Sequence, residues 1–180
     1  MVDERKKLLK LVKKKALTIG DITLSSGKKS NYYIDCRKIT LDPEGAYLVA
    51  SILLEFFREK RIDAVGGLTL GADPICGALA AVSYNLDNPL PAFIVRKKSK
   101  KHGTRNSVEG NLKPGYRVAV VDDVATSGGS LLQVVEIVQD MGCDVIKVVV
   151  IVDRDEGARE LLAKKGIRLE SIFSRADLGL

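Results

Sequence analysis

An almost unbroken apolar run, Val145 to Val152, constrains the fold of this chain more than any other segment. A strand with one wet face alternates apolar and polar residues, so a run of this kind is typical of a central parallel strand buried on both faces. Shorter apolar segments occur at Ile62 to Val65, Pro91 to Val95 and Arg117 to Val121. Helical patterns separate them, and this alternation predicts an α/β fold in which helices flank a central, mainly parallel sheet.

End signals mark the helices between these strands. Asp42-Pro43-Glu44 combines a capping carboxylate with a proline in the first turn and predicts a helix that runs to about Lys60. Asp73-Pro74 begins another helix. A third is expected over Ser130 to Met141, with Gly142 as its stop. One face of this third helix is apolar and carries Leu131, Val134, Val135 and Val138.

Residues 1–40 follow a different pattern. An amphipathic helix is predicted where four apolar residues recur at helical spacing among lysines, namely Leu8, Leu9, Val12 and Ala16. Asp21 to Arg37 alternates like a hairpin, with its turn at residues 25–28. Neither a repeat nor a linker is found, so we expect residues 1–180 to form a single domain.

Composition excludes several classes of protein. With 180 residues, of which 46% are hydrophobic and 29% charged, the chain can bury a core and does not have the composition of a disordered protein. Its apolar runs are too short to span a bilayer, and the charged N-terminus lacks the apolar core of a secretion signal. The cysteines, Cys36, Cys76 and Cys143, have neither pairing nor metal spacing, which favours a reduced, cytoplasmic setting.

The excess of positive charge lies in one segment. Arg96 to Arg105 contains six basic and no acidic residues, which equals the whole net charge of +6. A concentrated positive segment suggests an anionic ligand, either nucleic acid or a phosphorylated small molecule. On the charge run alone, a solvated loop is the favoured alternative.

The segment that follows Val121 carries the most specific chemical signal. Asp122 and Asp123 stand where the apolar strand is expected to end, at the edge of a parallel sheet where ligands bind. Carboxylates accept hydrogen bonds, which suits the paired hydroxyls of a ribose. Thr126-Ser127-Gly128-Gly129-Ser130 then opens a helix, where bare amides and the helix dipole favour a phosphate. A plain strand-to-helix turn explains one aspartate and one glycine, but it does not explain the whole run.

Residues 118–130 resemble the phosphoribosyl pyrophosphate-binding motif of type I phosphoribosyltransferases. The resemblance implies that Asp122 and Asp123 address the ribose hydroxyls and that Ala125 to Gly129 wrap the 5-phosphate. It implies contacts with phosphoribosyl pyrophosphate over the whole turn, that is, for Val124, Ala125, Thr126, Ser127, Gly128, Gly129 and Ser130. The Walker phosphate loop and the dinucleotide fingerprint are both absent. This motif does not choose the acceptor base.

The basic segment narrows the choice, because residues 96–103 resemble the catalytic loop of orotate phosphoribosyltransferases. Arg96, Lys97, Lys100 and His102 fall on its functional positions, where cations stabilise the departing pyrophosphate. The resemblance implies that Lys100 and His102 are catalytic together with Asp122 and Asp123. It also implies a loop that is disordered when empty, closes over the substrate and excludes water. In the family this loop reaches into the neighbouring subunit, so we expect a homodimer in which residues 96–106 act in trans.

Two further segments resemble the orotate site of this family. Residues 22–33 are similar to its N-terminal hairpin, which implies that residues 1–40 form a small hood over the base site and that Tyr32 and Tyr33 flank a flat ring. Residues 152–157 resemble its turn after the last long strand, where Arg154 would face the orotate carboxylate. Thr126 is expected to contact orotate as well. Without the motif, Arg154 could be a surface arginine beside acids.

The chain departs from the family pattern at two places. Ser25 stands where many members carry a lysine, and Lys28 or Lys29 could replace it. Residues 66–74 resemble the family's pyrophosphate loop, in which Thr69 and backbone amides would hold the diphosphate. Some relatives have a lysine in this loop, but residues 67–73 contain none.

The resemblance implies a glycosyltransferase that moves a phosphoribosyl group from phosphoribosyl pyrophosphate to orotate, giving orotidine 5'-monophosphate and pyrophosphate in pyrimidine biosynthesis. Mg²⁺ is the expected cofactor, held mainly by the substrate's pyrophosphate and ribose hydroxyls, with no dedicated protein metal site. A purine acceptor is one alternative and predicts no role for Arg154. A non-catalytic, nucleic-acid-binding sensor of the donor is another. It is disfavoured because no nucleic-acid module is found, and neither nucleic acid nor a membrane is expected as a partner.

Overall fold

The computed structural model describes residues 2–23, 27, 29–97 and 107–180. Its main feature is a six-stranded sheet in the order β5-β4-β3-β6-β7-β8. In chain order these strands are β3 (Ala64–Leu68), β4 (Ala92–Val95), β5 (Val108–Gly110), β6 (Arg117–Ala125), β7 (Asp144–Asp153) and β8 (Leu169–Ser174). Every neighbouring pair is parallel except β4 and β5, so the predicted α/β fold with a mainly parallel sheet is confirmed.

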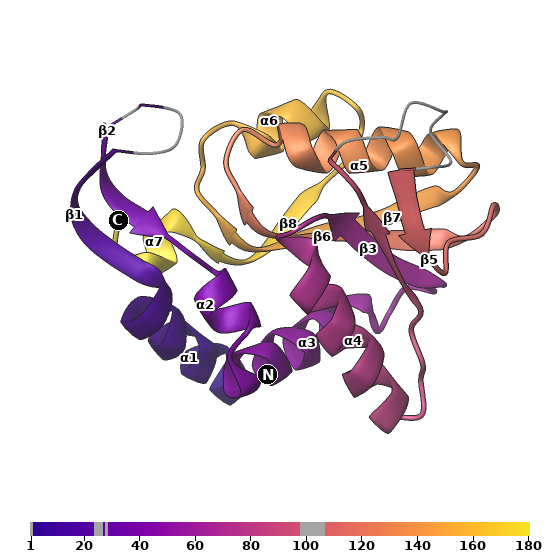
Figure 1. Cartoon of the computed structure of the whole chain (residues 1–180), viewed down its shortest axis with the longest axis horizontal. Helices are drawn as coiled ribbons and strands as arrows, with labels where there is room; N and C mark the ends of the chain where they lie inside the picture. Colours follow the sequence, from indigo (N-terminus) through magenta and orange to yellow (C-terminus); the bar gives the residue numbers. More distant parts are fainter. Residues whose placement is uncertain (1, 24–26, 28, 98–106) are drawn as a thin grey trace.

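Helices cover both faces of this sheet. The helical segments are α1 (Val2–Leu11), the π-helical turn η1 (Val12–Ala16), α2 (Arg37–Thr40), α3 (Pro43–Phe57), α4 (Ala72–Asn85), α5 (Gly129–Asp140), α6 (Ala158–Ala163) and α7 (Arg175–Leu178). Figure 1 shows α1, α3 and α4 on one side of the sheet and α5 with α6 on the other. Burial on both faces is the reason why β7 is apolar at nearly every position.

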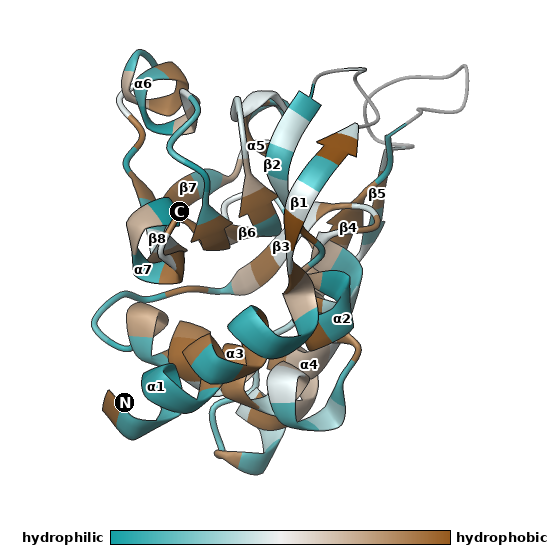
Figure 2. Ribbon diagram, turned by 90° about the vertical axis from the view of Figure 1, so that its left-hand side faces the viewer, coloured by the Kyte–Doolittle hydropathy of each residue, from teal (hydrophilic) through white to brown (hydrophobic). Residues whose placement is uncertain are grey.

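Two clusters of buried residues form the core. One lies between the sheet and α3 with α4 and includes Val49, Leu53, Ile75 and Leu79. The other lies under α5, where Leu131, Val134, Val135 and Val138 are buried, as the periodicity predicts. Residues 148–152 of β7 are all 0% exposed, and the strands between the helices are correspondingly brown in Figure 2.

The N-terminal residues pack against this core. Leu8, Val12 and Ala16 are buried in the cluster that α3 and α4 contribute to, so the predicted amphipathic helix is confirmed. The hairpin β1 (Leu17–Thr23) and β2 (Lys29–Ile34) forms a separate two-stranded antiparallel sheet at one end of the molecule (Figure 1).

The predicted hairpin limits, Asp21 to Arg37, were wrong at both ends. Strand β1 begins at Leu17, and β2 ends at Ile34. The Asp35 carboxylate accepts the backbone N–H of Arg37 at 3.3 Å, a local side-chain bond that turns the chain out of the strand. Arg37 therefore begins the short helix α2.

Other boundaries differ from the sequence-based expectation because of tertiary pairing. Strand β6 does not end at Val121 but continues to Ala125, since Val124 and Ala125 pair with Val152 and Asp153 of β7. Helix α3 ends at Phe57 and not near Lys60. Five short elements had no prediction, namely β5, β8, α2, α6 and α7.

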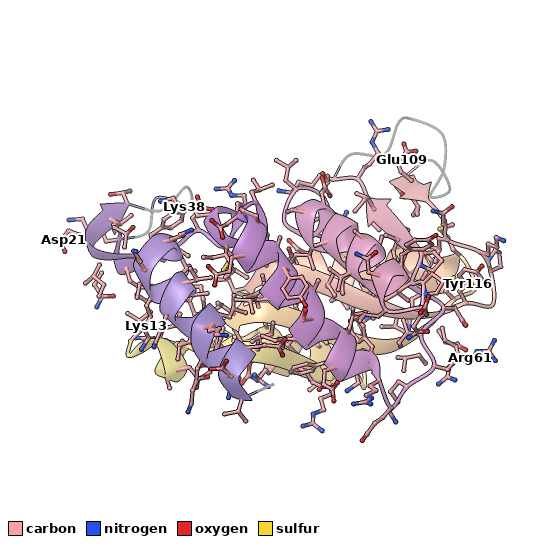
Figure 3. The ribbon with its side chains drawn as sticks, turned by 90° about the horizontal axis from the view of Figure 1, so that it is seen from below. Lys13, Asp21, Lys38, Arg61, Glu109 and Tyr116 are labelled. Carbon is pink, nitrogen blue, oxygen red and sulfur yellow. The ribbon has the colours of Figure 1, made fainter. Side chains whose placement is uncertain are left out.

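The strands run toward the hairpin. Arg61 and Tyr116, which precede β3 and β6, lie at the opposite end of the molecule from Asp21 of β1 (Figure 3). Across the described ranges, none of the helices combines the length and the apolar character needed to cross a bilayer. Cys36, Cys76 and Cys143 are buried free thiols.

Candidate active site

A cavity of about 340 Å³ opens at the carboxyl ends of β3, β6 and β7. It is lined by Tyr33, Ile34, Asp35, Arg37, Leu68, Thr69, Leu70, Gly71, Lys97, Asp122, Asp123, Val124, Thr126, Ser130 and Arg154. These residues come from the hairpin, α2, three strand ends and the start of α5. The cavity therefore lies at the edge of the sheet where parallel α/β folds bind their ligands.

Asp122 and Asp123 form the floor of this cavity although they are neighbours within a strand. Each carboxylate accepts the backbone N–H of the next residue, from Asp123 to Asp122 at 2.9 Å and from Val124 to Asp123 at 2.8 Å. Gly71 lies directly against both, since a Cβ atom there would stand 2.2 Å from Asp122 Oδ1 and 2.8 Å from Asp123 Oδ1. A glycine is required at this position because any side chain would displace the acids.

The two acids hold a proton more tightly than ordinary carboxyls. Burial, followed by the charge of Asp123, raises the pKa of Asp122 to about 7, and Lys97 opposes the shift. Burial also raises the pKa of Asp123, against the opposing effects of the Val124 N–H and the Arg37 charge. A cationic or hydroxyl-rich ligand would oppose these shifts by favouring the charged form of both carboxyls.

The turn between β6 and α5 forms a second, smaller cavity of about 170 Å³. It is lined by Asp122, Val124, Ala125, Thr126, Ser127, Gly128, Gly129, Ser130 and Leu131. Four of these residues, Asp122, Val124, Thr126 and Ser130, also line the larger cavity, so the two spaces adjoin. The small space lies at the N-terminus of α5, where the amide groups and the helix dipole favour a phosphate.

Gly128 determines the shape of this turn. Its φ is +84°, and a Cβ atom would lie 2.9 Å from Ala158 Cα, at the start of α6. The left-handed backbone brings the turn against α6 and opens the space above α5. Gly129 differs, because a Cβ atom there would meet only Ser127 Oγ, at 4.0 Å.

This difference predicts the stability of two matched variants. Gly128→Ala should lower the free energy of unfolding by about 1–3 kcal/mol, from the left-handed backbone and the contact with Ala158. Gly129→Ala should change it by less than about 0.5 kcal/mol or stabilise the protein slightly, since alanine is the better helix former. Urea unfolding of both variants measures the difference. Equal stabilities would contradict the strain assigned to Gly128.

Arg154, the first residue after β7, is held from three sides at the cavity wall. Its Nε donates to Tyr32 Oη at 3.2 Å, and its Nη2 pairs with Glu156 Oε1 at 2.8 Å. The guanidinium also lies over the Tyr32 ring, 4.9 Å from the centroid. Only 8% of Arg154 is exposed, so a buried, oriented guanidinium remains in contact with the cavity. A guanidinium held in this way can donate two parallel bonds to a ligand carboxylate.

The structure brings together most, but not all, of the residues singled out from the sequence. Thr69, Lys97 and Tyr33 line the larger cavity, and the Thr69 hydroxyl is held by Asp73 Oδ2 at 2.8 Å. Tyr32 is 3% exposed and supports Arg154 from behind, on the opposite face of β2 from Tyr33, and it does not line the cavity.

Arg96 also lies outside the cavity lining. Its side chain pairs with Glu109 at 3.0 Å, and its backbone N–H donates to Ser107. Lys100 and His102 fall outside the described residues, as do Ser25 and Lys28.

Sequence reasoning missed Asp35 and Arg37. Asp35 and Arg37 follow the two tyrosines directly, as two opposite charges with one residue between them, and this was the available signal. The predicted hairpin was extended over them, so they were not considered as cavity residues. Gly71 was placed in the diphosphate loop, but its closeness to Asp122 and Asp123 is a tertiary contact that the sequence does not indicate.

The donor set of the cavity fits a magnesium ion that the substrate holds. Within residues 2–97 and 107–180, apart from residues 24–26 and 28, no three His, Cys, Asp or Glu residues are grouped to hold a metal ion. Asp122 and Asp123 contribute two carboxylates, and oxygen donors of this kind suit Mg²⁺ that keeps further ligands from a diphosphate and water.

Fold and site together define a phosphoribosyltransferase, and the comparisons with known proteins agree. The family described as the phosphoribosyl transferase domain matches residues 38–175. The orotate phosphoribosyltransferase of Aquifex aeolicus is 49% identical over 178 residues, which cover 97% of each chain. The chain therefore belongs to the orotate phosphoribosyltransferase family.

Solved structures give the same result. The crystal structure of Mycobacterium tuberculosis orotate phosphoribosyltransferase in complex with Fe(III) dicitrate superposes with a TM-score of 0.88 at 40% identity, covering 98% of this chain and 99% of that one. Another structure of the enzyme from that organism, in complex with 5-phospho-alpha-D-ribosyl 1-diphosphate, has a TM-score of 0.83 at 37% identity, covering 98% and 99%. The expected type I phosphoribosyltransferase fold is confirmed.

Proposed function

We propose that this chain transfers the 5-phosphoribosyl group of phosphoribosyl pyrophosphate to orotate, releasing pyrophosphate and orotidine 5'-monophosphate. The observation that carries the proposal is the presence of Arg154 and the acidic pair Asp122 and Asp123 in one cavity, next to the turn at the start of α5. The acids suit a ribose diol, the turn suits a phosphate, and Arg154 suits the carboxylate that distinguishes orotate from uracil and purines.

Each wall of the cavity has a separate task in this reaction. The carboxylates of Asp122 and Asp123 accept hydrogen bonds from the ribose hydroxyls, and the amides and hydroxyls of residues 125–130 bind the 5-phosphate. Thr69 and the backbone of residues 69–71 face the diphosphate, with Lys97 nearby. Thr126 and Tyr33 complete the orotate side, while Tyr32 holds Arg154.

The chemical step is a displacement at the anomeric carbon of the ribose. A bond forms from the orotate ring nitrogen to this carbon as its bond to the pyrophosphate oxygen breaks, and the leaving pyrophosphate keeps the electron pair. The reacting ring nitrogen of orotate loses its proton in this step, and the proton passes to solvent or to the released pyrophosphate. Lys97, together with Lys100 and His102 of the segment outside the described residues, would stabilise the departing charge.

Mg²⁺ is proposed as the cofactor. When bound to the diphosphate, the ion neutralises part of the charge on the leaving group. Asp122 and Asp123 are the residues that would hold it, and a cation beside them would oppose the burial that raises their pKa values.

We also propose a cytoplasmic homodimer in which residues 96–106 act in the partner's site, with residues 1–40 as a hood over the base. Leu70 and Leu41 support this arrangement. They are 66% and 74% exposed, Leu70 at the cavity wall and Leu41 in a neighbouring hollow that shares Asp35 and Arg37 with the cavity. Exposed large apolar side chains of this kind favour burial by a second subunit. The three buried free cysteines are compatible with a reducing compartment.

The function is tested by incubating the protein with phosphoribosyl pyrophosphate, Mg²⁺ and one acceptor: orotate, uracil, adenine or hypoxanthine. Pyrophosphate release and nucleotide formation are followed together. Release that depends on orotate, with formation of orotidine 5'-monophosphate, is the expected result. Release that depends on a purine would overturn the acceptor assignment. If no acceptor led to pyrophosphate release, the transfer itself would be overturned.

Action in trans is tested by mixing two inactive variants, Arg154→Ala and Lys100→Ala. If residues 96–106 serve the partner's site, a mixed dimer contains one site that carries both changes and one site that carries neither. Activity should then reappear on mixing. Two inactive variants that stay inactive after subunit exchange would contradict the arrangement.

A further inference from the structure

Arg37 is a basic side chain of the cavity wall to which neither the sequence patterns nor the proposed mechanism assigns a task. Of the described residues that line the cavity, three are basic, namely Arg37, Lys97 and Arg154. The proposed function assigns Arg154 to the orotate carboxylate and places Lys97 near the diphosphate, which leaves Arg37 without a task. The side chain of Arg37 is 48% exposed and is therefore accessible to a ligand.

The Arg37 guanidinium is oriented by its neighbour. Its Nε donates to Asp35 Oδ1 at 2.8 Å, and the same oxygen accepts the Arg37 backbone N–H at 3.3 Å. This pairing engages the Nε edge of the guanidinium, whose terminal nitrogens carry four further N–H donors. A guanidinium fixed in this way can bind two phosphate oxygens at a smaller entropic cost than a flexible lysine.

The position of Arg37 relative to the acidic pair indicates which part of phosphoribosyl pyrophosphate it faces. Arg37 lines the same cavity as the ribose-binding acids Asp122 and Asp123. The 5-phosphate turn contributes a separate space, which Arg37 does not line. Arg37 shares the larger cavity with Thr69, Leu70 and Gly71, the loop that faces the diphosphate in the proposed function.

The loop at residues 69–71 leaves a need for positive charge there. Residues 67–73 contain neither Lys nor Arg, and Gly71 lies against two carboxylates. A diphosphate in this part of the cavity would bring several negative charges close to Asp122 and Asp123. A further cation, beside Lys97 and Mg²⁺, would offset more of this repulsion.

We propose that Arg37 binds the diphosphate of phosphoribosyl pyrophosphate, and the pyrophosphate that is released, and supplies the cation that the 67–73 loop lacks. The identity of the donor rests on the proposed function, but the assignment of Arg37 to a diphosphate does not depend on the acceptor base. Arg37 would thus contact the leaving group directly.

The test is calorimetric titration of the full chain at pH 7.5 in Mg²⁺ with two probes, pyrophosphate and ribose 5-phosphate. Arg37→Gln should weaken pyrophosphate binding by about 10- to 100-fold, the range for losing hydrogen bonds to a charged group. Ribose 5-phosphate binding should change by less than about twofold, because the acids and the phosphate turn remain. The matched control is Lys38→Gln, which removes the same charge from the adjacent exposed residue at the edge of the molecule (Figure 3) and should leave both affinities unchanged.

Two results would overturn the proposal. One is an Arg37→Gln variant that binds pyrophosphate as tightly as Lys38→Gln does. The other is an equal loss for both probes, which would mean that Arg37 acts only through Asp123 or through the fold of α2. If Arg37→Gln does not fold, Arg37→Lys is the deciding variant. An affinity for pyrophosphate that falls selectively by about threefold or more supports two-point binding by the guanidinium, and an unchanged affinity refutes it.

Failure of this proposal can be told apart from failure of the proposed function. A wild-type protein that converts orotate while Arg37→Gln binds pyrophosphate normally would reject only the role of Arg37. A wild-type protein that is inactive with orotate but whose pyrophosphate binding depends on Arg37 would reject only the acceptor.

Discussion

Arg154→Ala should lower kcat/KM for orotate by about 10²- to 10³-fold, because removing one partner of a buried, hydrogen-bonded charge pair costs about 2–5 kcal/mol. The loss should appear mainly in KM for orotate if Arg154 binds the substrate and the transition state alike. Affinity for phosphoribosyl pyrophosphate should change by less than about twofold, since Arg154 does not line the smaller cavity that the phosphate turn forms. Steady-state kinetics with each substrate varied in turn measures both quantities.

Three comparisons sharpen this result. Arg154→Lys keeps the charge but loses the planar fork and should recover only part of the activity. Arg168→Ala removes an exposed arginine that does not line the cavity and should behave as the wild type. The preference for orotate over uracil should shrink in Arg154→Ala. A variant that keeps its full preference would show that another residue recognises the carboxylate.

Asp122→Asn should make the protein more stable and its donor binding weaker. The pKa of Asp122 is raised to about 7 in the folded protein, chiefly by burial, from an ordinary value of 3.8. Between these two values the folded state binds more protons than the unfolded state, so the free energy of unfolding falls as pH rises through this window. This loss of stability is absent below about pH 4 and complete above about pH 7. The Asp122→Asn variant does not undergo it, because asparagine does not ionise.

Above pH 7 the free energy of unfolding of the variant should therefore exceed that of the wild type by roughly 1–3 kcal/mol. This is less than the full pKa shift of Asp122 implies, because Asp122 titrates together with Asp123 and touches cavity solvent. For a chain of this size it corresponds to a rise in Tm of several degrees, about 2–4 °C per kcal/mol. The wild-type and variant melting curves should converge toward pH 4. Affinity for phosphoribosyl pyrophosphate should fall by about 10- to 100-fold, because an amide presents only one acceptor oxygen to the ribose hydroxyls.

The control is Asp144→Asn, an exposed acid at the start of β7, remote from the carboxyl-end cavity. Its stability should follow that of the wild type at every pH. If Asp122→Asn were less stable than the wild type at pH 8, the buried charge would be stabilising. The explanation of its raised pKa by burial would then be wrong.

Much of the part of the site that binds phosphoribosyl pyrophosphate could be predicted from the sequence, because its residues are contiguous. The apolar strand, the two acids and the glycine turn lie within residues 117–130, and the cavities contain the residues from Asp122 to Ser130 that this pattern indicates. The end of β6 was misplaced because pairing with β7 extends a strand beyond its apolar residues. The short elements β5, β8, α6 and α7 carried too little periodicity to be recognised.

The orotate side was only partly predictable. Arg154 and Tyr32 were both singled out, but as independent contacts to the base. In the structure Tyr32 lies behind Arg154 and helps to orient it. Arg37 was read as the end of a strand, because the turn that Asp35 makes was not anticipated.

The sequence by itself determined the class of fold and the type of ligand. Strand burial, a left-handed glycine and a run of phosphate-binding amides are local properties, which a few adjacent residues specify. Only the tertiary structure decided which residues come together. Arg154 contacts Tyr32, 122 positions away, Gly71 lies against Asp122, and the charge of Arg37 acts on Asp123. The pKa of Asp122 belongs to this second group, since it depends on burial and on neighbouring charges. Such interactions act through space and leave no periodic mark along the chain.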